Sequence, residues 1–135
     1  MTDVAAILNA HPRTLPGIDE DALVIAVTEC LNCAQSCTSC ADACIADPSA
    51  AHLGRSAGMA LNCADMATSA VRVLSRPTAY DRAVTEAVLR ALIENCRAGY
   101  EEHRKHAPAN EASVICAEAC RKCGQACRHL LGSLG

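Results

Sequence analysis

Cysteine and apolar residues recur at steps of three and four along most of this chain, which is the period of one face of an α-helix. Proline and glycine interrupt the pattern at Pro12, Leu15-Pro16-Gly17, Asp47-Pro48, Arg76-Pro77 and Ala107-Pro108. Because a proline usually ends a helix at or before the preceding residue, these breaks divide the chain into one short and four long helical segments.

Capping residues and breaks together predict where each helix begins and ends. A short helix is expected from Asp3 to Ala10. The long helices are expected from Asp19, as N-cap, to about Ala46, from near Ser49 to near Ser75, from Thr78 to about His106, and from Asn110 to near Leu131, where Gly132 closes the helix. These segments predict an all-α fold, an antiparallel up-down-up-down four-helix bundle with a short N-terminal helical arm. We expect residues 1–18 to form the arm and residues 19–135 a single-domain bundle.

Two of the long helices contain a series of cysteines. Residues 30–44 have the sequence C-L-N-C-A-Q-S-C-T-S-C-A-D-A-C, and residues 116–127 have the sequence C-A-E-A-C-R-K-C-G-Q-A-C. With about 3.6 residues per turn, such steps place every thiol of a series on one narrow face. The candidate metal ligands are Cys30, Cys33, Cys37, Cys40, Cys44, Cys116, Cys120, Cys123 and Cys127, with Cys63 and Cys96 from the other two helices.

Residue counts from the turns after Ala46 and after His106 place the thiols of all four helices at matching heights. Cys44 and Cys116 are expected nearest those turns, then Cys37, Cys40, Cys96 and Cys120, then Cys33, Cys63 and Cys123, and finally Cys30 and Cys127. Beyond the last layer the expected inward residues are apolar, namely Leu23, Ala26, Val71, Leu74, Val84, Val88, Leu130 and Leu134. One half of the bundle is therefore predicted to be a tube lined with sulfur, and the other an ordinary core.

Three more residues are candidate ligands. Met59 and Met66 flank Cys63 and offer thioethers, although filling the core is the simpler role. His103 lies seven residues after Cys96, so it should face inward at the open end of the tube, where a neutral imidazole can meet an incoming ion. The alternative is a solvated histidine favoured by the helix dipole. The position of His52 is less clear, His106 is expected to be solvated, and His129 is expected to face outward.

The composition indicates the cellular compartment and disfavours some classes of function. The chain has 135 residues, a net charge of −3 and no Phe or Trp, so small and aliphatic side chains must form a closely packed core. No block of basic residues favours nucleic acid, and no segment has the length of a membrane span. The first twenty residues lack the pattern of a secretory signal. We therefore expect a cytoplasmic protein, in which eleven cysteines stay reduced and serve as metal ligands.

The chemistry of thiolates limits the metals. Soft thiolates select Cu(I), zinc and iron–sulfur clusters, and metal binding supplies the charge that a buried thiolate needs. A continuous row of thiols favours several low-coordinate Cu(I) ions that share sulfurs. An iron–sulfur electron carrier remains an alternative because C-x-x-x-C-x-x-C occurs from Cys33 and from Cys116, as does a zinc-binding or purely structural bundle. No enzyme is expected, since a glycine-rich phosphate loop and the Glu-x-x-His pair of di-iron bundles are both missing.

With these motifs, the chain resembles the bacterial copper storage proteins, which are cysteine-rich four-helix bundles. The resemblance spans roughly residues 19–131 and rests on the two cysteine series and the helix lengths. It implies homotetramers that store many Cu(I) ions on inward thiolates, with uptake at one end, and a copper chaperone or efflux component as partner. The cytosolic branch is the more similar one.

That branch usually has more cysteines than this chain. Other residues occupy six expected inward positions here, namely Ala26, Ser56, Ala67, Leu92, Gly99 and Ser113. We therefore expect a reduced copper capacity, with the ions concentrated along the two helices that contain the cysteine series.

Overall fold

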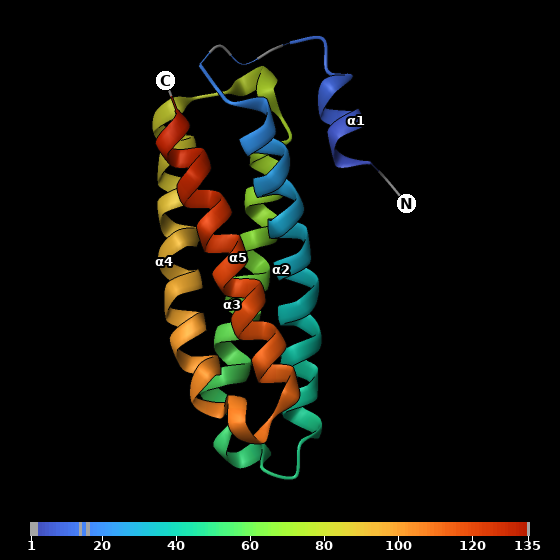
Figure 1. Ribbon diagram of the computed structural model, residues 1–135, viewed down its shortest axis with the longest axis vertical. Coiled ribbons are helices and arrows are strands. Elements are labelled where there is room, and N and C mark those ends of the chain that lie inside the picture. Colours follow the sequence, from blue (N-terminus) through green and yellow to red (C-terminus); the bar gives the residue numbers. More distant parts are fainter. Residues whose placement is uncertain (1–2, 14, 16, 135) are drawn as a thin grey trace.

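Four long helices lie side by side along one axis, and a short fifth helix lies outside them (Figure 1). The computed structural model describes residues 3–13, 15 and 17–134. Its α-helices are α1 (Val4–Asn9), α2 (Glu20–Ala46), α3 (Gly54–Leu74), α4 (Arg82–His106) and α5 (Glu111–Ser133). Successive long helices run in opposite directions, and α2 packs against both α3 and α5 (Figure 1). The prediction of an all-α bundle is confirmed.

Polar caps begin the helices as the sequence predicts at two places. The Asp19 carboxylate accepts a hydrogen bond from the Ala22 N–H at 3.1 Å, and the Asn110 side chain accepts one from the Ser113 N–H at 3.0 Å. Each bond satisfies a backbone donor that the first turn of a helix leaves unpaired. The short helix α1 ends at Asn9, one residue before the predicted end at Ala10.

Three other helix ends differ from the prediction. Helix α3 begins at Gly54 and not near Ser49, because Ala50–His52 first form a 3-10 helix. Helix α4 begins after Asp81, whose carboxylate caps Val84, while the predicted cap Thr78 lies within the separate 3-10 helix Pro77–Ala79. Gly132 does not close α5, which continues to Ser133, because its φ is not positive and the chain stays helical. Pro16, in the predicted break, lies outside the described residues, as do the termini Met1 and Gly135 of the predicted arm and bundle.

The half of the bundle near the chain termini has an aliphatic core. Leu23, Leu74, Leu89 and Leu130 are buried there. The prediction that Val84 faces inward is wrong, since its side chain is 55% exposed. Buried positions on α4 instead follow Thr85, Leu89, Leu92 and Cys96, at steps of four, three and four. Val71 and Val88 are half-buried and pack against this core.

None of the helices in the described ranges is both long enough and apolar enough to cross a membrane.

Candidate metal centre

All eleven cysteines are buried in the other half of the bundle, with side chains at most 3% exposed, and all are free thiols. Helix α2 supplies Cys30, Cys33, Cys37, Cys40 and Cys44, α5 supplies Cys116, Cys120, Cys123 and Cys127, and α3 and α4 supply Cys63 and Cys96. The helical period explains this arrangement, because steps of three and four keep each thiol on the face that packs against the neighbouring helices.

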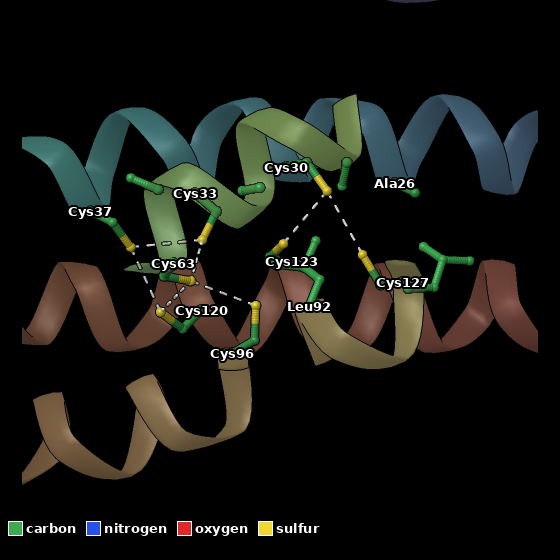
Figure 2. Close-up of a cluster of buried hydrophobic side chains, with 14 of the residues drawn as sticks. Ala26, Cys30, Cys33, Cys37, Cys63, Leu92, Cys96, Cys120, Cys123 and Cys127 are labelled. Carbon is green, nitrogen blue, oxygen red and sulfur yellow. Dashed lines mark hydrogen bonds between the residues drawn. The ribbon is translucent and has the colours of Figure 1, made fainter. Parts of the chain in front are cut away.

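The central group contains four sulfurs from three helices (Figure 2). The Sγ atoms of Cys33, Cys37, Cys63 and Cys120 all lie within 4.8 Å of one another. Cys33 and Cys63 are 3.5 Å apart, and Cys120 lies 3.8 Å from Cys37 and 3.7 Å from Cys63. Soft metal ions can therefore meet several sulfurs here with little movement of the backbone.

Further sulfurs continue this group toward the aliphatic core. Cys30 lies 3.7 Å from both Cys123 and Cys127, and these three form a second group (Figure 2). Cys96 forms a third group with Cys33 and Cys123. It therefore lies at the height of these two cysteines, whereas the sequence predicts it at the level of Cys37 and Cys40. Because Cys33 and Cys123 each belong to two groups, the sulfurs form one continuous array.

The array also extends toward the α2–α3 and α4–α5 turns, which we call the open end. Cys37 and Cys116 are 3.4 Å apart. Cys116 forms a fourth group with Cys40 and His103, whose ligand atoms lie within 4.8 Å of one another. Cys44 is buried nearest the α2–α3 turn.

His103 is fully buried and faces the array, as the spacing from Cys96 predicts. Its Nδ1 lies 2.9 Å from the hydroxyl of Ser56. Burial lowers the pKa of the imidazole, so the ring is neutral and able to donate a lone pair. The other histidines do not share this position, since His52 and His129 are exposed and His106 is half-buried.

The two candidate thioethers are half-buried. Met66 packs against the buried core that includes the cysteines. A ligand role for Met59 and Met66 stays a prediction, and core filling accounts for the position of Met66.

Hydrogen bonds between thiols influence which sulfurs lose a proton first. A hydrogen bond from Cys120 lowers the pKa of Cys63 to about 5, and one from Cys116 lowers that of Cys40 to about 7. Burial raises the pKa of Cys44 to about 11. The pKa of Cys123 is also raised, because it shares its proton with Cys127 and other sulfurs. Hydrogen bonds among the sulfurs therefore favour ionisation at some positions and oppose it at others, and a bound cation would replace the protons of its thiol ligands.

The six inward positions without a thiol are all buried, namely Ala26, Ser56, Ala67, Leu92, Gly99 and Ser113. Ser56 and Ser113 bring hydroxyl groups to these positions, and the other four bring no side-chain ligand atom. A Cβ at Gly99 would lie 3.3 Å from Cys120 Sγ and 3.7 Å from His103 Nε2, so the glycine leaves room beside both atoms.

Sequence reasoning missed Glu102, a buried acid beside His103. Its carboxylate oxygens lie 3.1 Å from Lys105 Nζ, 3.6 Å from Arg55 Nε and 3.6 Å from His106 Nε2. Burial opposes its ionisation, but Lys105 and the other cations lower its pKa overall. Basic residues three and four positions later on the helix were the available signal.

The open end has a surface hollow of about 270 Å³ lined by residues of both turns, among them His52 and His106. The Asn110 side chain donates to the Asp47 carboxylate at 3.1 Å and so joins the two turns.

Comparison with known proteins agrees with this geometry. The sequence profile of the copper storage protein family matches residues 19–132. The copper storage protein Ccsp of Streptomyces lividans, loaded with 10 copper equivalents, is 45% identical, with a TM-score of 0.95 over 97% of this chain and 99% of that one. The same cytosolic protein with five coppers is 47% identical, with a TM-score of 0.84 over 85% of this chain and 96% of that one. No match was found among curated protein sequences.

Proposed function

Because this chain belongs to the copper storage protein family, and so stores copper, we propose that it holds several Cu(I) ions per chain on its inward thiolates. The proposed ligands are the eleven cysteines, with His103 as a nitrogen ligand at the open end. The observation that best supports this proposal is the sharing of Cys33 and Cys123 between groups of sulfurs, because shared thiolates suit a chain of ions better than isolated sites.

The choice of Cu(I) rests on the ligands. An array of thiolates with one imidazole is a soft donor set, and among the described residues the four groups that could hold an ion contain no carboxylate. A monovalent ion of low coordination number fits sulfurs of facing helices that lie 3.4 to 3.8 Å apart in pairs. The relatives loaded with five and ten coppers support storage of several ions by one chain.

The remaining parts of the proposal rest on the resemblance to this family. We infer a cytosolic location, as for the S. lividans protein, and assembly as a homotetramer with residues 19–135 as one domain behind the arm 1–18. A copper chaperone or an efflux component would deliver or collect the ions. The proposed activity is storage and buffering, without catalysis.

A quadruple variant tests the proposal. Changing Cys33, Cys37, Cys120 and Cys123 to serine removes members of three of the four groups and leaves only the group of Cys40, Cys116 and His103 complete. We expect most Cu(I) uptake to be lost while circular dichroism stays helical. Undiminished uptake would show that the central sulfurs are not needed for copper binding. A brown product with visible charge-transfer bands would indicate an iron–sulfur cluster instead.

A further inference from the structure

Ser56 and His103 form a buried pair between α3 and α4. Both side chains are fully buried, and the Ser56 hydroxyl oxygen lies 2.9 Å from His103 Nδ1. Ser56 also lies close to the Cys44 thiol of α2, where its hydroxyl opposes part of the rise that burial causes in the pKa of that thiol. One hydroxyl thus connects the imidazole with a cysteine at the open end.

The hydrogen bond to Nδ1 permits two neutral tautomers of the ring. In the first, the Ser56 O–H donates to Nδ1, and the ring proton is on Nε2. In the second, the Nδ1–H donates to the Ser56 oxygen, and Nε2 has a free lone pair. The position of Nε2 distinguishes these cases, because this atom is buried and has no hydrogen-bond partner among the described residues.

The second tautomer satisfies more of the buried groups. The first would leave a buried N–H without an acceptor, and burying such a donor is unfavourable. The second tautomer keeps the ring proton on Nδ1, which donates to the Ser56 oxygen, and leaves the Ser56 O–H free to turn toward the nearby Cys44 sulfur. Burying the Nε2 lone pair without a hydrogen-bond donor costs less free energy, since buried acceptors without a partner are less rare than buried N–H groups without one.

The Nε2 atom lies near the part of the sulfur array that α5 supplies. A single point beside the α4 backbone, where Gly99 lacks a Cβ, lies 3.7 Å from Nε2 and 3.3 Å from Cys120 Sγ. A nitrogen of His103 also lies within 4.8 Å of the Cys40 and Cys116 sulfurs. A lone pair on Nε2 would therefore face an ion held by the α5 thiols.

We propose that Ser56 is a positioning residue, which accepts the Nδ1–H of His103 and so leaves Nε2 as the nitrogen presented to copper. Ser56 occupies an inward position that would also suit a cysteine, and in this proposal the serine has a role of its own. The position of the ring proton is a property of the copper-free protein, whereas binding of copper by Nε2 rests on the proposed function.

Nitrogen-15 NMR of the reduced, copper-free protein tests the assignment at mildly alkaline pH, where the ring is neutral. Protonated and unprotonated imidazole nitrogens have well-separated shifts, and the signals absent from His103→Gln identify His103. We expect Nδ1 protonated and Nε2 unprotonated. In Ser56→Ala the ratio of the two tautomers should change by roughly two- to tenfold, as loss of one hydrogen bond predicts.

Two variants serve as controls. Ser56→Thr keeps the hydroxyl and should restore the original tautomer, and Ser69→Ala removes an exposed hydroxyl from the same helix and should change nothing. A proton on Nε2 in the unaltered protein, or an unchanged ratio in Ser56→Ala, would overturn the proposal.

Addition of Cu(I) to the same labelled sample tests the second part. We expect the Nε2 signal of His103 to shift on binding, while Nδ1 stays protonated. Coordination through Nδ1, with loss of its proton, would overturn the proposed role of Ser56. If the protein bound no copper, the proposed function would fail, but the tautomer measured without copper would still decide the role of Ser56.

Discussion

The sulfurs of Cys37 on α2 and Cys116 on α5 lie 3.4 Å apart, and this contact joins the central sulfurs to those at the open end. Cys37 belongs to the central group of four, whereas Cys116 belongs to the group with Cys40 and His103. Ions that move between the open end and the centre can therefore pass from one sulfur to the next without leaving the array.

Substitution of Cys116 by serine should interrupt this path. We expect fewer Cu(I) ions per chain and slower loading, because a hydroxyl is a poor ligand for a soft ion. The free energy of unfolding should fall by only about 1 kcal/mol, as is typical when one buried hydrogen bond is altered. Stopped-flow loading and a chelator titration would measure both effects on copper.

Cys44→Ser provides the comparison for that variant. Cys44 belongs to none of the groups of three or more potential ligands found among the described residues. Its replacement should therefore reduce loading less than replacement of Cys116. Equal losses in the two variants would argue against a path through Cys116.

The aliphatic half should determine stability without affecting copper. Leu89 is fully buried there, and Leu89→Ala should lower the free energy of unfolding by about 2 to 5 kcal/mol through the cavity that it leaves. Val84→Ala, at a side chain that is 55% exposed, should change it by less than about 0.5 kcal/mol. Denaturant unfolding of the copper-free variants measures these values, and a changed copper stoichiometry in either would be unexpected.

The sequence predicts the bundle well because proline breaks and three-to-four spacing act locally. It predicts the inward thiols for the same reason, since a helical period fixes the face of every cysteine. The start of α4 depends on a choice between Thr78 and Asp81 as the cap, and only packing of the turn decides it. Val84 lies twelve residues before the inward Cys96, which is about 120° round the helix, so the helical period itself places this side chain outside the core.

Contacts between helices could not be predicted in this way. The hydrogen bond between Ser56 and His103 joins residues 47 positions apart, and the cluster around Glu102 includes Arg55 from another helix. Helical spacing indicates which face a residue occupies, but the partner on the neighbouring helix depends on the packing of the whole bundle.

Gly99→Ala should separate helix stability from copper binding. An alanine favours the helix by about 1 kcal/mol, but its methyl would lie 3.3 Å from Cys120 Sγ and would force that sulfur to shift. We expect similar or slightly higher stability of the copper-free protein and weaker Cu(I) binding in chelator competition.

Gly58→Ala is the matched control, since a Cβ at that helical glycine meets no atom within 4 Å. It should gain the same helix propensity while binding copper normally. Identical Cu(I) affinities in the two variants would show that the space beside Cys120 is unimportant.

Glu102 should make stability depend on pH in the acid range. Its pKa is lowered in the folded protein, so its contribution is fully present above the unfolded-state value of about 4.3 and is lost as pH falls through the lower folded value. Glu102→Gln should cost about 1 kcal/mol near neutral pH, because its cationic partners are largely exposed. Unfolding curves of both proteins should converge as the pH falls, and a constant difference would contradict this role.

The most direct test of copper storage is an anaerobic Cu(I) titration of the fully reduced protein against a competing chelator, with the thiols counted on the same sample. The array of buried thiols, with Cys33 and Cys123 shared between groups, predicts a colourless product that saturates at several ions per chain. Saturation at one ion or none would contradict the account and would leave the family resemblance as evidence for the fold alone.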